Sequence, residues 1–140
     1  MTGRIMAIDY GSKRIGIAFS DPLRMFAKAH SVIENAPLNL LVPKLKGLIE
    51  QNDAKLIVLG MPYAIDGSDT PKTTETKAFM NKLQELLDIP VISFDERYSS
   101  AEAETELKKM GKSWQEARKM VDAMAAAMIL KSYLESKDRQ

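Results

Sequence analysis

The chain has 140 residues, 45% of them hydrophobic, which is the usual size of one domain with a sizeable core. The 20 Lys and Arg residues nearly balance 19 Asp and Glu residues, so the net charge of +1 gives no overall attraction to nucleic acid or acidic lipid. The absence of cysteine excludes disulfides, thiolate zinc sites and a cysteine nucleophile, and it fits a reducing cytoplasm.

The apolar runs of the sequence are too short for membrane insertion. The run before Asp9 is shorter than a signal peptide requires, and Met120–Leu130 falls well below the roughly 20 residues of a membrane span. We therefore expect a soluble, cytoplasmic protein that forms a single domain over residues 1–140 and has no membrane partner.

The first expected elements are strands. Arg4–Asp9 is a short apolar run that ends at a turn-forming sequence, and Ile15–Ser20 is another that stops at an Asp-Pro pair, so together they predict a hairpin. A third strand is expected at Ala29–Glu34. From about Pro43 to Asn52, apolar residues at helical spacing predict an amphipathic helix.

The middle of the chain alternates strands and helices. Lys55–Gly60 has the continuous apolar character of a strand that is buried on both faces. The polar segment Met61–Lys77 predicts a long loop followed by the start of a helix. A last buried strand is expected from Val91 to Asp95 or Glu96.

The final part of the chain is expected to be helical. Two Ser-x-x-Glu capping boxes, at Ser99 and at Ser113, each predict a helix start. The whole order combines an antiparallel hairpin with later strands that are joined by helical crossovers. It predicts an α/β fold in which a mixed sheet carries helices on both faces.

Three carboxylates occupy unusual positions beside or inside apolar runs. Asp9 ends the first strand, Glu96 ends the last strand, and Asp122 lies in the apolar stretch Met120–Leu130, where an unpaired charge is costly. If the first and last strands are parallel neighbours, Asp9 and Glu96 emerge at one sheet edge, where ligands of open α/β sheets bind. The final helix can then bring Asp122 to them.

Three acids so close together are stable at neutral pH only if protons or cations neutralise them. Ligands that are all oxygen atoms select hard ions such as Mg²⁺ or Mn²⁺. Two such ions can bridge a phosphodiester and activate a water molecule, with no side-chain nucleophile. The acids therefore predict phosphoryl hydrolysis at a two-ion site, with Asp9 between the ions and Glu96 and Asp122 completing their shells.

Four motifs occur in order along nearly the whole chain: IDYGSKRIGIAFSD (Ile8–Asp21), VLGMPYAIDG (Val58–Gly67), DERYSS (Asp95–Ser100) and VDAMAAAMIL (Val121–Leu130). Together they resemble the YqgF/RuvX family of pre-16S rRNA nucleases, which is related to the Holliday junction resolvases. The resemblance implies a ribonuclease H-like fold with five strands. It also implies a divalent-metal nuclease that matures the 5′ end of 16S rRNA.

The resemblance assigns the catalytic and metal-binding residues position by position. The aspartate of the D-x-G motif is Asp9, the glutamate of the D-E-R motif is Glu96, and the aspartate of the V-D-x-x-A-A helix is Asp122. After D-E-R the chain has Tyr-Ser-Ser where the family often has Leu-Thr-Thr. This departure leaves the metal ligands untouched and bears only on local substrate contacts.

Each acid also has a plainer interpretation. Asp9 could simply close a turn, Glu96 could pair with Arg97, and Asp122 could pair with nearby Lys119 or Arg118. These structural roles need no metal ion.

Several cations are candidate substrate contacts, because a phosphate backbone is attracted to exposed Lys and Arg. They lie at the hairpin turn, in the long loop, next to Glu96 and before the last helix: Lys13, Arg14, Lys72, Arg97 and Lys119. The plainer interpretation is a set of solvated surface charges.

The leading hypothesis is a metal-dependent nuclease that acts on precursor rRNA as a monomer or weak dimer. Ribosomal particles are a further expected partner. One alternative is a DNA endonuclease that resolves Holliday junctions with the same acids. Another is a nucleic-acid-binding module without catalysis. A sugar kinase or actin-like ATPase also begins with a strand, a D-x-G turn and a hairpin, but 140 residues are too few for its second lobe.

Overall fold

The computed structural model describes residues 3–98 and 120–138. The elements in these ranges are β1 (Arg4–Tyr10), β2 (Arg14–Ser20), β3 (Ala27–Glu34), α1 (Leu38–Gln51), β4 (Ala54–Met61), α2 (Pro71–Leu86), β5 (Val91–Asp95), the 3₁₀ turn η1 (Glu96–Tyr98) and α5 (Val121–Asp138). The capping boxes predicted at Ser99 and Ser113 lie outside the described residues.

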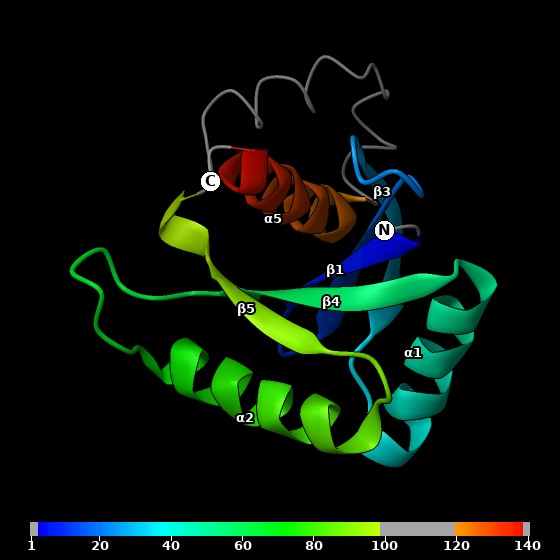
Figure 1. Ribbon diagram of the computed structural model, residues 1–140. Coiled ribbons are helices and arrows are strands. Elements are labelled where there is room, and N and C mark those ends of the chain that lie inside the picture. Colours follow the sequence, from blue (N-terminus) through cyan, green and yellow to red (C-terminus); the bar gives the residue numbers. More distant parts are fainter. Residues whose placement is uncertain (1–2, 99–119, 139–140) are drawn as a thin grey trace.

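The strands form one five-stranded mixed sheet with the order β3-β2-β1-β4-β5 (Figure 1). β1 and β2 form the predicted antiparallel hairpin, β3 extends it, and β4 and β5 run parallel to β1. The expectation that the first and last strands are neighbours is wrong, because β4 lies between β1 and β5. After β3 the chain passes through α1 to the side of β1 that β2 leaves free, so β4, and not β5, pairs with β1.

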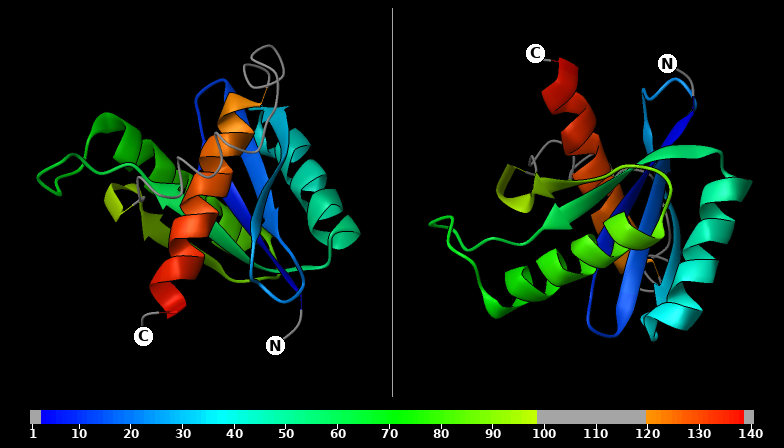
Figure 2. Two further views of the ribbon diagram at one scale, coloured as in Figure 1. Left: turned by 90° about the horizontal axis from the view of Figure 1, so that it is seen from above. Right: turned by 60° about the horizontal axis from the view of Figure 1, so that its bottom comes forward.

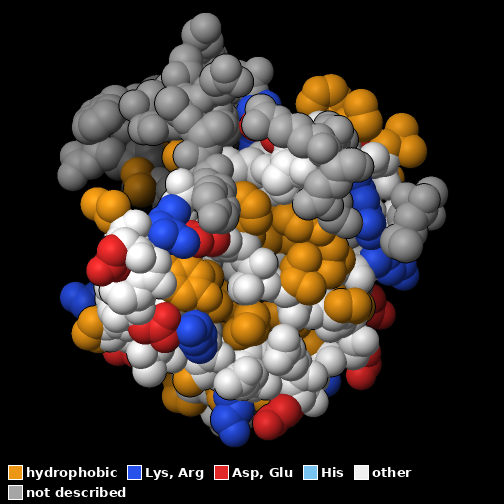
Figure 3. Space-filling view, turned by 60° about the vertical axis from the view of Figure 1, so that its left-hand side comes forward, with side chains coloured by type: hydrophobic (Ala, Val, Ile, Leu, Met, Phe, Trp, Pro, Cys, Tyr) orange, Lys and Arg blue, Asp and Glu red, His pale blue; other side chains and the backbone are white. Residues whose placement is uncertain are grey.

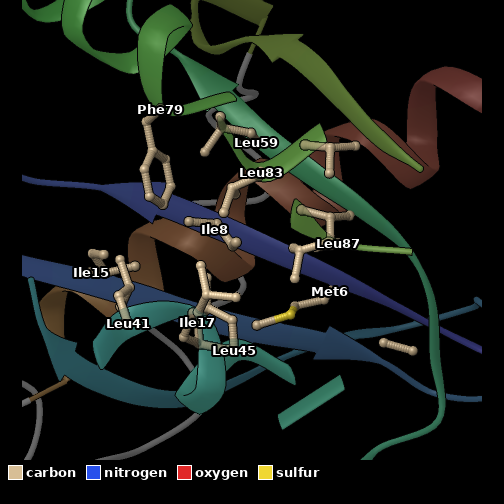
Figure 4. Packing of buried hydrophobic residues seen from close by; sticks show 14 of the residues in the cluster. Met6, Ile8, Ile15, Ile17, Leu41, Leu45, Leu59, Phe79, Leu83 and Leu87 are labelled. Carbon is tan, nitrogen blue, oxygen red and sulfur yellow. The ribbon is translucent and has the colours of Figure 1, made fainter. Parts of the chain in front are cut away.

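Helices cover both faces of the sheet, as expected. Figures 1 and 2 show α5 on one face and α1 and α2 on the other. Along β1, Met6 and Ile8 point into the core beneath α1 and α2 (Figure 4), whereas Ile5 and Ala7 point into the core beneath α5. This alternation of side chains decides which residues of each strand can reach α5. No described helix is both long and apolar enough to cross a membrane.

The first helix begins earlier than predicted. α1 starts at Leu38, so that Pro43, the expected start, lies inside it. Leu41 and Leu45, one helical turn apart, are fully buried and hold this segment against the sheet. A proline near a helix start lacks one backbone hydrogen bond, and the buried leucines offset that loss.

Candidate active site

Asp9 lies near the carboxyl end of β1, with its side chain on the face that α5 covers. Ile5 and Ala7 precede it on that face, and alternation along the strand places Asp9 next in the row. Each neighbouring strand contributes a glycine at the same level. Gly16 of β2 pairs with Asp9, and Gly60 of β4 follows Leu59, the partner of Ile8.

The two glycines make room for the other two acids. A Cβ atom at Gly16 would overlap the backbone carbonyl of Asp122, so the first turn of α5 rests directly on the β2 backbone. A Cβ atom at Gly60 would lie 2.5 Å from Ile129 Cδ1 and 3.1 Å from the carboxyl carbon of Glu96. The glycines thus bring Asp122 and Glu96 to either side of Asp9.

Glu96 reaches this place across an intervening strand. It is the first residue of η1, directly after β5, and its side chain lies over Gly60 of β4. The predicted convergence of Asp9 and Glu96 is therefore present in the fold, although it depends on Gly60 and not on adjacent strands.

Burial and mutual repulsion shape the electrostatics of the two acids. Burial raises the pKa of Asp9 to about 6, with the Lys72 charge opposing the rise and the Asp122 charge adding to it. Burial also raises the pKa of Glu96 to about 7, and the charge of Asp9 contributes in the same direction. Two acids with raised pKa values at a sheet edge are typical of a functional site.

Asp122 occupies the first turn of α5, where the positive end of the helix dipole favours a carboxylate. Its Oδ2 accepts a hydrogen bond of 2.9 Å from Nε of Arg14 at the hairpin turn. The partner considered from the sequence, Lys119, lies outside the described residues. The ion pair with Arg14 connects two segments that are distant in sequence, and no helical spacing could have indicated it.

A cavity of about 520 Å³ opens beside Asp122. It is lined by cationic, acidic and backbone groups of the hairpin turn, α2 and α5: Tyr10, Gly11, Ser12, Lys13, Arg14, Lys72, Glu75 and Asp122. Lys72 is the second residue of α2, whose start is secured by reciprocal hydrogen bonds between Thr70 and Thr73. Three of the five predicted substrate cations, Lys13, Arg14 and Lys72, therefore line one cavity.

Arg97 has a position that the sequence did not indicate. Its guanidinium forms a bidentate pair with Asp95, donates a hydrogen bond of 3.2 Å to the Ile65 carbonyl and lies against Gly67. It joins the loop after β4 to the end of β5. Its predicted contact with substrate stays a prediction, and Lys119 lies outside the described residues.

The donor set suits a hard divalent cation. All three acids offer oxygen ligands, and the raised pKa values of Asp9 and Glu96 indicate negative charge that a cation would stabilise. Within residues 3–98 and 120–138, no three acidic or histidine side chains are yet gathered tightly enough to bind an ion. The Asp122 carboxylate is bonded to Arg14 instead.

Figure 3 looks onto the side at which β4 and β5 end. Acidic and basic side chains lie next to one another on this side, around a hydrophobic area. The side is thus mixed in charge, and the attraction of a polyanion to it depends on individual cations.

Comparison with known proteins places this geometry in a family. The RuvX family, described as Holliday junction resolvase, matches residues 3–136. A protein of Syntrophomonas wolfei named "Putative pre-16S rRNA nuclease" is 42% identical over 132 residues, which are 94% of each chain. A protein of the same name from Halothermothrix orenii is 40% identical over 131 residues, again 94% of each chain.

A solved structure shares the fold. The chain is similar to Thermus thermophilus RuvC in complex with a Holliday junction substrate, with a TM-score of 0.59, 12% identity and 96% coverage of both chains. The predicted fold class, a ribonuclease H-like α/β fold whose five-stranded mixed sheet has helices on both faces, is confirmed.

Proposed function

The chain belongs to the RuvX family of Holliday junction resolvases, and we propose that it is a divalent-metal-dependent nuclease that matures the 5′ end of precursor 16S rRNA. The substrate is proposed from the name that the Syntrophomonas and Halothermothrix relatives carry. We further propose that residues 1–140 form a single nuclease domain that acts in the cytoplasm.

The observation that carries the proposal is the pair of glycines beside Asp9. At Gly16 and Gly60, Asp122 and Glu96 approach the strands so closely that a Cβ atom would overlap or crowd them. Side chains there would push both acids away from Asp9. The close approach at both glycines is explained if the three carboxylates bind one ligand together.

In the proposed site Asp9, Glu96 and Asp122 hold one or two ions of Mg²⁺ or Mn²⁺. Bound ions of this kind neutralise a phosphodiester and lower the pKa of a water molecule. Lys72 lies close enough to Asp9 and Glu96 to lower the pKa of both. The same charge, with Lys13 beside it in the cavity, would attract the phosphates that flank the cleaved bond.

The decisive experiment is Asp9→Asn, assayed on precursor 16S rRNA with Mg²⁺ or Mn²⁺. Loss of cleavage is expected, with a melting temperature in EDTA at neutral pH that is equal to or higher than that of the wild type, because the amide keeps the shape and removes a buried charge. Asp53→Asn is the matched control, since Asp53 is exposed, lies in a left-handed turn and flanks β4 at the end remote from Gly60. Cleavage by Asp9→Asn at the rate of the wild type would overturn the assignment.

The same assay separates the two candidate substrates. Four-way junction DNA is run beside precursor RNA of equal length at one salt concentration, because polyanion affinity depends steeply on salt. Faster cleavage of the RNA supports the proposal. Faster cleavage of the junction DNA would make the chain a junction resolvase.

A further inference from the structure

A second surface lies at the opposite end of β1 from Asp9. It comprises the start of β1, the end of β2, residues 21–26 and the start of β3. The start of β1 and the connection between β2 and β3 lie together there in both views of Figure 2. Arg4 and Asp9 are five residues apart on β1, so the two surfaces are separated by about 17 Å.

The connection between β2 and β3 is a tightly bonded turn. The Asp21 carboxylate accepts hydrogen bonds of 2.8 and 2.7 Å from the backbone N–H groups of Met25 and Phe26. Arg24, with a φ of 61°, donates from Nε to the Gly3 carbonyl at 3.0 Å. These bonds hold the turn in one conformation against the start of β1.

The turn presents large apolar side chains to solvent. Leu23 is 72% exposed, Met25 66% and Phe26 74%. Three such side chains within four residues form a patch, whereas single exposed apolar residues are common on any protein. Because hydrogen bonds fix the turn, the exposed Phe26 ring is available for stacking against a planar ligand.

A cationic cavity of about 490 Å³ adjoins the turn. The described residues of its lining offer basic, amide, hydroxyl and apolar side chains and no carboxylate: Arg4, Phe19, Ser20, Lys28, Ala29, His30, Asn52 and Met120. Lys28 is exposed and forms no ion pair with any described residue. The His30 ring is exposed and lies edge-on to Phe19, with 5.0 Å between ring centroids.

We propose that this turn and this cavity form a second binding surface for single-stranded RNA. Phe26 stacks on an unpaired base, and Arg4, Lys28 and His30 hold an adjacent phosphate. Stacking on an exposed aromatic beside a cationic groove is the common mode of single-strand recognition. The identity of the ligand rests on the proposed nuclease function, since an RNA that reaches the acids would continue over the surface of the protein, outside the buried strand β1, to this end.

RNA fits the combined surface better than a protein segment does. The cavity holds the cations Arg4 and Lys28 with no carboxylate among the described residues of its lining, which matches a continuous polyanion, in a chain whose net charge is only +1. An acidic protein segment is the competing occupant, and the experiment below separates the two.

The test measures RNA binding by fluorescence anisotropy, with EDTA present so that no RNA is cleaved. The probe is a single-stranded RNA of about 16 nucleotides, the upper range for such surfaces. Phe26→Ala is expected to weaken binding roughly tenfold. Lys28→Glu should weaken it and also reduce the dependence of affinity on salt.

Matched controls are Leu40→Ala, 56% exposed on α1, and Lys44→Glu, exposed on the same helix. Both should bind the long RNA like the wild type. Because the assay measures binding and not cleavage, its result can be interpreted even if the Asp9→Asn experiment overturns the proposed catalytic function.

Equal binding of the long RNA by the wild type, Phe26→Ala and Lys28→Glu would overturn the proposal. If the same variants lose cosedimentation with ribosomal particles while RNA binding is unchanged, the surface contacts protein. That outcome also overturns the proposal.

Discussion

Arg14 and Asp122 join the hairpin turn to the first turn of α5 through an ion pair of 2.9 Å. The Arg14 side chain is 65% exposed and the Asp122 side chain 30% exposed, so this contact adds about 1 kcal/mol or less to stability. Its greater effect is electrostatic, because the Arg14 guanidinium neutralises the Asp122 carboxylate, which the proposed site needs as a ligand for a metal ion.

Arg14→Ala should therefore bind Mn²⁺ more tightly than the wild type, by several-fold in calorimetric titration. The free energy of unfolding in EDTA should fall by no more than about 1 kcal/mol. Lys13→Ala, which removes a neighbouring cation that no described residue pairs with, should change metal affinity less. Weaker metal binding by Arg14→Ala would show that Arg14 orients Asp122 and does not compete for it.

Gly16→Ala should destabilise the protein strongly, because its Cβ would overlap the backbone carbonyl of Asp122. Forcing α5 away from β2 should cost about 3 kcal/mol in urea unfolding, at the upper end for overpacking. Gly47→Ala is the control, since nothing lies within 4 Å of its Cβ position in α1. There alanine should stabilise the helix by about 1 kcal/mol. Equal stability of both variants would contradict the packing of α5 on Gly16.

Stability without metal should fall as the pH rises from about 4 to about 7. The folded protein has raised pKa values at Asp9 and Glu96, about 6 and about 7, against 3.8 and 4.5 for ordinary side chains. In this range it binds more protons than the unfolded chain, so rising pH removes stability. Melting temperatures in EDTA check the slope, and Asp9→Asn should flatten it. A slope of the opposite sign would show that the acids are already compensated.

Arg97→Ala should loosen the loop at residues 62–68. The change removes the hydrogen bond to the Ile65 carbonyl and the contact with Gly67. Faster hydrogen exchange at the Gly67 amide, which bonds to the Ala64 carbonyl, is the expected readout. Lys55→Ala, which breaks an exposed ion pair elsewhere, is the control. Unchanged exchange with weaker RNA binding would favour the substrate contact predicted from the sequence.

Much of the fold was predictable because its strands are short apolar runs that end at turn residues. The hairpin, the buried strand β4 and the places of Asp9 and Glu96 at strand ends follow from that pattern. The start of α1 was not predictable, because Leu41 and Leu45 override the signal of Pro43 only once a sheet is present to bury them. Strand order depends on crossovers, which periodicity does not encode.

The candidate site was predictable in its acids and not in what brings them together. Gly16 and Gly60 interrupt strands where a side chain would be expected, and such glycines often mark close approach of another segment. The pairing of Arg14 with Asp122 and the exposure of Phe26 depend on tertiary placement, which no local pattern contains.

The alternation along β1 limits how the distance between its two ends can change. Inserting one residue between Ile5 and Asp9 would turn the carboxylate to the face of α1 and α2, away from Glu96 and Asp122. Only an insertion of two residues returns the Asp9 side chain to the face of α5, and it lengthens the strand by about 7 Å. If both ends hold one RNA, the distance between the two binding surfaces can therefore change only in steps of two strand residues, and the bonded turn at residues 21–26 keeps its own place at the far end.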